Sequence, residues 1–234
     1  MTLIVDGNNL VNASYFISKS RNEFATTEET KENVVHIFKT QIAKLKRDFF
    51  TDKVYIAWDG RNGSKWRKEI LPEYKANRNK DGKEDLFKCL SQCRELEENN
   101  NFLFDTFEGD DVVYALCRAI DNDEKIIISA DKDFLQVVQE GLASKLFNQI
   151  SKQYREIPEI SSIIEKSICG DSSDNLFGIR GKGIAFVKKF VKRQVFLNEQ
   201  EKEVFEKHKL VIGLRNNPYK NELLELVKKQ LTNS

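Results

Sequence analysis

The sequence predicts an α/β protein in which a mostly parallel central sheet carries helices on both faces and is followed by a helical region. Two observations predict this fold class. Short apolar runs alternate with segments of helical periodicity through the first part of the chain, and after Pro158 only helical patterns remain. The 234 residues suffice for one large or two small domains. We therefore expect an α/β domain over residues 1–157 and a helical region over residues 158–234, with an arch at about residues 61–100.

Each element follows from its local pattern. β-branched or aromatic runs bounded by polar residues predict four strands: Thr2–Val5, Val54–Trp58, Phe102–Phe107 and Lys125–Ser129. Apolar residues at three- and four-residue spacing predict the helices between them: Thr27–Phe50, Asp85–Asn99 and Asp110–Ile120. The same spacing predicts four helices in the second region: Glu159–Ile168, Ile184–Val191, Glu199–Ile212 and Tyr219–Leu231. A glycine-rich stretch from Gly178 to Gly183 separates the first two of these.

The composition excludes several classes of protein. No apolar run approaches the roughly 18 residues that a membrane-spanning helix needs, and no basic segment followed by an apolar stretch marks a secretory signal near Met1. The four cysteines form no C-x-x-C pair and there are only two histidines, which argues against a structural zinc site. We expect a cytoplasmic protein that does not bind membranes, most simply a monomer.

The net charge of +1 conceals a strong segregation of charge. Seven basic residues lie between Arg61 and Lys80, and six lie between Arg180 and Arg193 with no acidic residue among them. The segment Asp105–Asp111 instead carries four carboxylates and no cation. Such local polarisation suits a protein that holds a metal ion and a polyanion together. Either basic run by itself is also typical of a solvated helix face.

Acidic residues follow the predicted strands at the point where each one ends. They are Asp6, Asp59, Glu108, Asp110, Asp111, Asp131 and Asp133. The carboxyl ends of parallel strands lie along one edge of a sheet, where open α/β sheets bind their ligands. A single Asp after a strand is commonly a turn or helix cap, but repetition of the placement on four strands favours a site.

A group of crowded carboxylates requires compensating charge, because neighbouring carboxylates repel and raise each other's pKa. Their hard oxygen ligands suit Mg²⁺ or Mn²⁺. The number of acidic residues exceeds what one octahedral Mg²⁺ takes, since that ion keeps several waters. Two ions about 3.5–4 Å apart are a common device for cleaving phosphodiesters, so the sequence predicts a two-metal site.

Six fragments in a fixed order carry a resemblance to a known family. They are IVDGNNL at Ile4–Leu10, WDG at Trp58–Gly60, LPEYKANR at Leu71–Arg78, EGDD at Glu108–Asp111, SADKDF at Ser129–Phe134 and GDSSDNL at Gly170–Leu176. With these fragments, the sequence over about residues 1–195 resembles the flap endonuclease / 5′→3′ exonuclease family. That family includes the phage 5′ nucleases and the nuclease domain of bacterial DNA polymerase I. The resemblance implies a PIN-like 5′ nuclease fold with a helical arch and a helix-three-turn-helix motif.

The resemblance also implies two sets of metal ligands. Asp6, Asp59, Glu108 and Asp110 would hold a first ion with Asp111 beside them. Asp131, Asp133, Asp171 and Asp174 would form the group of a second ion. Two Mg²⁺ ions are expected, with Mn²⁺ as a substitute.

Basic and aromatic residues of the arch are implied to act on the substrate. Lys75 and Arg78, three residues apart, would share one helix face and neutralise the scissile phosphate; with Asp110 they are the expected catalytic residues. Tyr74 and Trp66 are candidates for stacking on an unpaired base, and Arg67 for a phosphate contact.

The glycine turn resembles the part of the family's motif that grips the duplex backbone. Glycines allow main-chain N–H groups to approach a phosphate closely, and lysines follow them here. The expected nucleic-acid contacts are Gly178, Gly181, Lys182, Gly183, Lys188 and Lys189. In relatives a K⁺ ion often sits in this turn.

Together these features predict a structure-specific 5′ nuclease. It would hydrolyse DNA, or an RNA–DNA primer, at flaps, nicks, gaps and junctions, leaving a 5′-phosphate and a 3′-hydroxyl. The expected roles are replication and repair; as no polymerase sequence follows Ser234, the nuclease is expected to act alone or with replication proteins. Two alternatives are a ribonuclease on the PIN-like scaffold and a catalytically inactive junction-binding protein.

Overall fold

The centre of the molecule is a six-stranded sheet in the order β3-β2-β1-β4-β5-β6. The computed structural model describes residues 1–78, 81–96, 100–121 and 123–233. The parallel strands are β1 (Thr2–Asp6), β2 (Val54–Trp58), β3 (Asn100–Leu103), β4 (Lys125–Ile128) and β5 (Lys145–Asn148). The last strand, β6 (Gln153–Tyr154), pairs antiparallel with β5. The predicted α/β class with a mostly parallel sheet is therefore confirmed.

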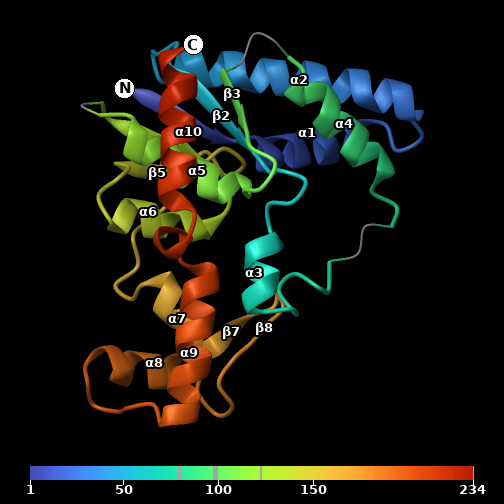
Figure 1. Ribbon diagram of the computed structural model, residues 1–234. Coiled ribbons are helices and arrows are strands. Elements are labelled where there is room, and N and C mark those ends of the chain that lie inside the picture. Colours follow the sequence, from blue (N-terminus) through green and yellow to red (C-terminus); the bar gives the residue numbers. More distant parts are fainter. Residues whose placement is uncertain (79–80, 97–99, 122, 234) are drawn as a thin grey trace.

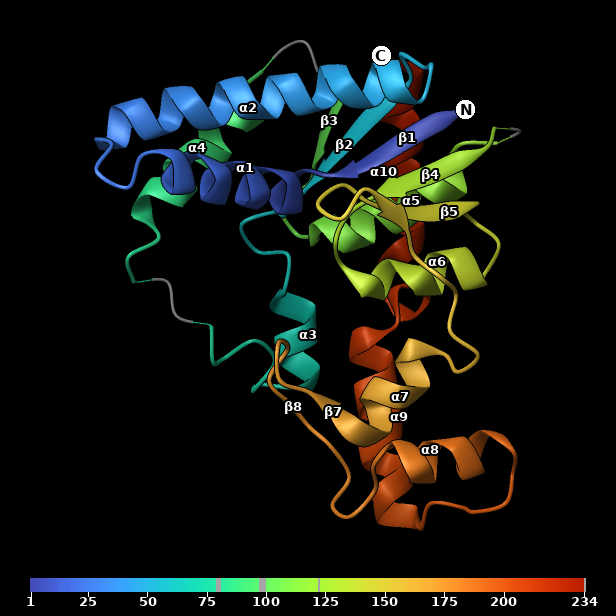
Figure 2. The ribbon, with the colours of Figure 1, turned by 180° about the vertical axis from the view of Figure 1, so that it is seen from behind.

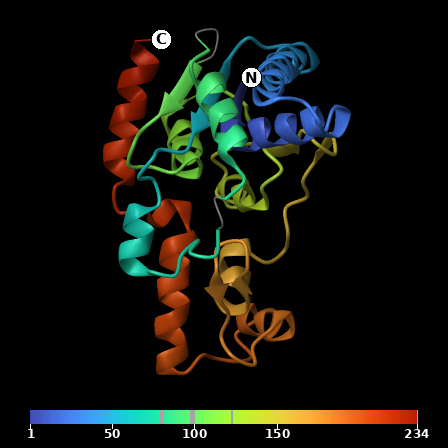
Figure 3. The same ribbon diagram turned by 90° about the vertical axis from the view of Figure 1, so that its right-hand side faces the viewer.

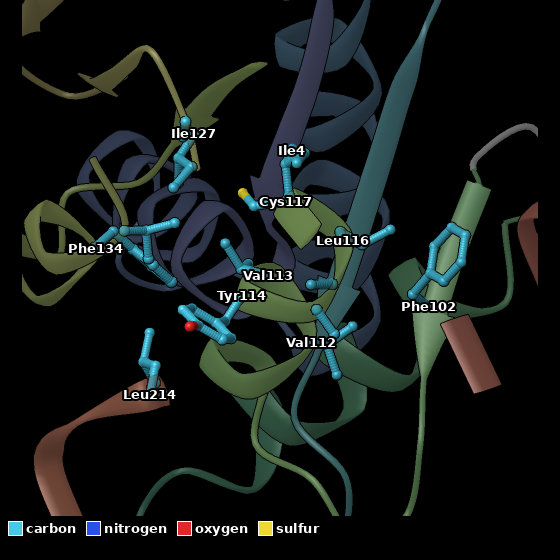
Figure 4. Close-up of a cluster of buried hydrophobic side chains, with 14 of the residues drawn as sticks. Ile4, Phe102, Val112, Val113, Tyr114, Leu116, Cys117, Ile127, Phe134 and Leu214 are labelled. Atoms are coloured by element: carbon cyan, nitrogen blue, oxygen red, sulfur yellow. The ribbon is translucent and has the colours of Figure 1, made fainter. Parts of the chain in front are cut away.

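Alternation along β1 divides the core between two faces of the sheet, and Figures 1 and 2 show the helices that cover these faces. Leu3 and Val5 pack with α1 (Gly7–Arg21), α2 (Thr27–Asp48) and α4 (Glu84–Arg94). Ile4 points to the other face, into a cluster with Phe102 and Val113 that Figure 4 shows. That face carries α5 (Gly109–Ala119), the short helices η1 (Lys132–Phe134) and α6 (Leu135–Gln139), and α10 (Lys220–Thr232).

A second, mainly helical part lies below the sheet in Figure 1. Its elements are α7 (Ser162–Cys169), β7 (Gly170–Asp171), β8 (Leu176–Phe177), α8 (Ile184–Val191), α9 (Glu199–Ile212) and η2 (Leu214–Asn216). The expectation of helices alone after Pro158 is corrected by the β7–β8 hairpin. Strands of two residues have no periodicity for a sequence pattern to reveal.

The C-terminal helix α10 returns to the sheet. Figure 3 shows it running up beside the α/β part, and Leu223 and Val227 are buried in the same cluster as Val113 of α5. Packing thus crosses the predicted boundary between residues 157 and 158, and the two-part division of the chain stays a prediction.

The arch segment differs from expectation. Its helices are α3 (Lys65–Ile70) and α4, and residues 72–77 form turns. Lys75 has a φ of 55°, so it and Arg78 do not share the helix face predicted for them. The predicted helix Asp85–Asn99 ends at Arg94. Lys80 and Asn99 lie outside the described residues.

Two further predictions are corrected near the strand ends. The predicted strand Phe102–Phe107 ends at Leu103, and a turn with Phe107 N donating to Phe104 O leads into α5. The helix α1 was not predicted, because its opening Gly-Asn-Asn is a poor helix former; the Asp6 carboxylate caps it by accepting from Asn9 N. In the described part of the chain, no helix is long and apolar enough to cross a membrane.

Candidate active site

The first carboxylates of the site are held at the ends of adjacent strands. Asp6 ends β1, and its Oδ2 accepts from Ser129 Oγ at 2.8 Å, next to the end of β4. Asp59 follows β2, and its oxygens accept from Gly109 N and Asn8 Nδ2, both at 2.7 Å. Since the strand order reverses at β1, this edge is where an open α/β sheet places its ligands.

Burial and mutual repulsion raise the pKa values of these acidic groups. Burial raises the pKa of Asp6 to about 7, with further contributions from Asp59 and Asp131. Burial also raises the pKa of Asp110, at the start of α5, together with the negative charges of Asp131 and Asp6. Four carboxylates, those of Asp6, Asp59, Asp110 and Asp131, thus interact with one another and are called here the carboxylate centre. Lys75 compensates their negative charge only in part, as a site for cations requires.

Glu108 differs from the carboxylate centre because cations of the chain surround it. Lys75 Nζ donates to its Oε1 at 2.8 Å, while Tyr74 Oη donates to Oε2 at 3.1 Å and Arg67 Nη1 lies 3.0 Å from that oxygen. Burial alone would raise the pKa of Glu108, but the charges of Arg67 and Lys75 outweigh it and lower the pKa to about 2. Glu108 is therefore ionised and already neutralised by cations of the chain.

Three predicted roles are corrected by this network. Arg67 is 2% exposed, and its guanidinium binds both oxygens of Asp111 at 2.8 Å. Its predicted phosphate contact and the metal ligation predicted for Asp111 are both unavailable, because each charge is committed to the other in the interior. Tyr74 and Trp66 are 3% and 5% exposed, so neither ring presents a surface on which a base can stack.

A second group of carboxylates joins the two parts of the chain. Asp133 of η1, Asp171 of β7 and the following Asp174 each offer an oxygen, and these oxygens lie within 4.8 Å of one another. Asp131 adjoins them, since its Oδ1 accepts from Asp133 N at 2.9 Å. This donor set fits a hard divalent cation, because every donor is a carboxylate oxygen.

The described residues contain no other set of three acidic, His or Cys side chains gathered so tightly. Direct ligation of a first ion by Asp6, Asp59, Glu108 and Asp110 therefore stays a prediction.

Lys166 is a residue of the site that sequence reasoning missed. It projects from α7, and its ammonium forms ion pairs with both Asp133 and Asp171. Burial alone would lower the pKa of Lys166, but the two carboxylates raise it above its ordinary value. No spacing in the sequence singles out Lys166, because it precedes Asp171 by five residues and follows Asp133 by 33. Only the fold sets it between them.

The turns of the arch are fastened to the β7–β8 hairpin. Lys75 N donates to Asp174 O at 2.9 Å, and Asn77 Nδ2 donates to Ser172 O at 2.9 Å. These contacts hold Lys75 in a left-handed conformation that a non-glycine residue adopts only under such constraint. The ammonium of Lys75 is thereby placed among Glu108, Asp110 and Asp174, which raise its pKa against the effect of burial.

Arg78 is the more exposed of the two arch cations. Its Nη2 is 3.2 Å from Asp174 Oδ1, and its side chain is 53% exposed. The guanidinium is therefore partly neutralised and accessible to an anionic ligand.

The glycine turn combines one close backbone contact with two open positions, since no atom of the described residues, chain neighbours aside, lies within 4 Å of a Cβ built at Gly181 or Gly183. A Cβ at Gly178 would lie 2.2 Å from Cys169 O, and Gly181 has a φ of +75°. Lys182 is paired with Glu201 at 2.9 Å, whereas Lys188 and Lys189 of α8, like Gly183 before it, are exposed. The helix-three-turn-helix assignment stays a prediction.

The fold is that of a doubly wound α/β protein with the carboxylate centre at the carboxyl edge of its sheet. The family model of the 5′-3′ exonuclease N-terminal resolvase-like domain matches residues 1–166. The chain belongs to this family.

Curated relatives support this family membership, and solved structures share the fold. A 5′-3′ exonuclease of Mycoplasmopsis pulmonis is 33% identical over 77% of this chain and 62% of its own length. A DNA polymerase I of Caldicellulosiruptor bescii is 27% identical over 84% of this chain and 25% of its own length. The chain thus spans less than two thirds of these relatives. The zinc-bound structure of T5 5′-exonuclease superposes with a TM-score of 0.76 at 18% identity, covering 99% of this chain and 98% of the other.

Proposed function

We propose that this chain is a divalent-metal-dependent 5′→3′ exonuclease and flap endonuclease that hydrolyses phosphodiesters at single-strand/duplex junctions. The observation that carries the proposal is the meeting of carboxylates from both parts of the chain. Asp110 from the α/β part and Asp174 from the helical part both act on the ammonium of Lys75, and Asp133 offers an oxygen within 4.8 Å of one of Asp174. Membership of the 5′-3′ exonuclease family supports it.

The carboxylates would hold two Mg²⁺ ions, with Mn²⁺ as a substitute, in the sets formed by Asp6, Asp59 and Asp110 and by Asp131, Asp133, Asp171 and Asp174. Glu108, which Arg67 and Lys75 already neutralise, would border the first set, with its orientation fixed by Lys75 and Tyr74. When bound, such ions acidify water and stabilise charge on a phosphate.

The chain's own cations would position the substrate. Lys75 places a positive charge beside Asp110 of the carboxylate centre, where it would pair with a phosphate oxygen and stabilise the charge that develops in the transition state. Arg78, on the accessible side, would orient the same phosphate through its fork of donors. Both then act on the reacting group directly.

Duplex binding is assigned to the helical part. Main-chain N–H groups around Gly178, Gly181 and Gly183 would contact backbone phosphates, with K⁺ as a companion ion of the turn. The exposed Lys188 and Lys189 would extend this contact electrostatically. Lys182 would have to leave Glu201 to take part, so its contribution is expected to be the smaller one.

The proposed substrates are DNA flaps, nicks, gaps and junctions, together with RNA–DNA primers. One structural neighbour, the bacteriophage T5 D15 flap endonuclease, was solved as a complex with DNA and metal ions. A cytoplasmic monomer that acts in replication and repair beside replication proteins is the cellular setting we propose.

The decisive experiment is a cleavage assay on 5′-flap, nicked, gapped and RNA-primed duplexes with Mg²⁺, Mn²⁺ or EDTA. We expect cleavage with either ion, none with EDTA, and loss of cleavage in Asp110→Asn. Asp48→Asn, an exposed carboxylate of α2, is the matched control and should cleave normally. Binding to the junctions without cleavage, or cleavage of RNA alone, would reject the proposal.

A further inference from the structure

Lys166 occupies the centre of the carboxylate group that spans the two parts of the molecule. Its ammonium forms ion pairs with Asp133 of η1 and with Asp171 of β7. The side chain reaches these partners from α7 and is 23% exposed. A single cation of the chain therefore already links the α/β part to the helical part at this point.

The same oxygens are needed by a bound ion. Asp133 and Asp171, with Asp174, are the three residues whose oxygens lie within 4.8 Å of one another. An ammonium has three donors and no lone pair, so Lys166 cannot become a ligand of a metal. Two cations at one set of oxygens also repel each other strongly.

We propose that the Lys166 ammonium is the resident counter-cation of the Asp133–Asp171–Asp174 cluster and has to leave it when a divalent ion binds. Lys166 thereby lowers the affinity of this cluster for metal. The partial exposure of the side chain gives the displaced ammonium access to solvent. The inference rests on the proposed metal binding, but it does not depend on nuclease activity.

Other nearby cations do not perform this role. Lys75 Nζ is hydrogen bonded to Glu108 at 2.8 Å, and Arg78 reaches Asp174 at 3.2 Å from a largely exposed position. Neither is paired with Asp133 or Asp171 in the ion pairs of the described residues. Replacement of Lys166 therefore has a specific effect on this cluster.

The test is Mn²⁺ binding to the DNA-free protein, measured by the electron paramagnetic resonance signal of free Mn²⁺. The binding step that Asp174→Asn abolishes is assigned to the cluster. In Lys166→Met the dissociation constant of this step should fall by about tenfold, because Mn²⁺ no longer has to displace two partly exposed ion pairs. Lys166→Arg, which keeps the charge, should remain as weak as the wild type. Lys209→Met, which removes a surface cation paired with Glu206, should leave the step unchanged.

Thermal unfolding supplies a second measurement that a merely structural role would not reproduce. Without metal, Lys166→Met should unfold at a lower temperature than the wild type, because the carboxylates lose their counter-charge; saturating Mn²⁺ should then raise its Tm by more. Equal or weaker Mn²⁺ affinity in Lys166→Met would overturn the inference while leaving the proposed function intact. Absence of any Asp174-dependent step in all variants would overturn both.

Discussion

The conformation of Lys75 is fixed by tertiary contacts at its backbone and at its ammonium. Its backbone is fixed by Asp174 O, its ammonium by Glu108, and its φ of 55° departs from the helix that its spacing to Arg78 suggested. The i,i+3 spacing predicted a shared helix face for the two residues, and this prediction is wrong. Tertiary hydrogen bonds decided the conformation.

Replacement of Lys75 by Ala should reduce turnover of a flap substrate by roughly 10²–10³-fold, because one preorganised positive charge near the developing charge is lost. The fold should persist, since Glu108 keeps Arg67 and Tyr74 as partners. Single-turnover cleavage together with circular dichroism measures both effects. Lys228→Ala, a surface cation paired with Glu225, is the control. Turnover within a factor of two or so of the wild type would remove Lys75 from the reaction.

Asp6 provides a pH-dependent prediction for the metal-free protein. Its pKa is raised from 3.8 to about 7, mainly by burial. At a pH between these two pKa values, the unfolded chain has lost a proton that the folded protein retains. The free energy of unfolding should therefore fall as the pH rises from about 4 to about 7. Asp6→Asn keeps a good N-cap for α1 and lacks this penalty.

We expect Asp6→Asn to match the wild type near pH 4 and to exceed its stability by on the order of 4 kcal/mol above pH 7 without metal. Urea denaturation in EDTA across this pH range gives the comparison. The lowered pKa of Glu108 acts below about pH 4 and is common to both proteins. Parallel pH profiles for the two proteins would contradict the assignment.

At the scale of elements, α3 is joined to α5 and α9 through one buried side chain. Arg67 of α3 binds Asp111 of α5 with two hydrogen bonds and donates from Nε to Val211 O of α9 at 3.0 Å. A buried pair of this kind has little net effect on stability when it is replaced as a unit, but loss of one partner leaves a charge unpaired in the interior.

Arg67→Met should accordingly lose about 3–5 kcal/mol of stability. The double replacement Arg67→Met with Asp111→Leu should recover a large share of that loss, because no unpaired charge remains. Urea denaturation of the two single variants and the double variant measures the coupling. A double variant less stable than either single variant would show that the pair acts through geometry rather than charge.

At the scale of the whole molecule, the last helix ties the C-terminal residues to the sheet. Leu223 of α10 is 1% exposed in the α5 cluster, whereas Leu226 on the same helix is 39% exposed. The predicted division at residue 157 would place α10 in a separate unit. The packing instead makes α10 part of the core of the α/β layer.

Leu223→Ala should cost about 2–5 kcal/mol, the range for removing a buried leucine, and Leu226→Ala less than about 0.5 kcal/mol. Because α10 belongs to the α/β core, Leu223→Ala should shift the unfolding of the sheet itself, followed through hydrogen exchange of β1 and β4. Destabilisation confined to residues 158–233 would instead favour the predicted division.

The sequence by itself determined the fold class, most of the strands and helices, and the position of acidic residues at strand ends. These features are local, since they depend on side-chain periodicity and on which residue follows each strand. The helices Ile184–Val191 and Glu199–Ile212 coincide with α8 and α9.

Only the tertiary structure decided which charges are exposed and which are paired with each other in the interior. Arg67 and Asp111 lie in the interior as partners, and Lys166 lies between Asp133 and Asp171. Burial and pairing arise from contacts between residues far apart in the chain, and a charged side chain has the same appearance in a sequence whether it ends in solvent or in a buried ion pair. The electrostatic character of the site is therefore a property of the assembled fold.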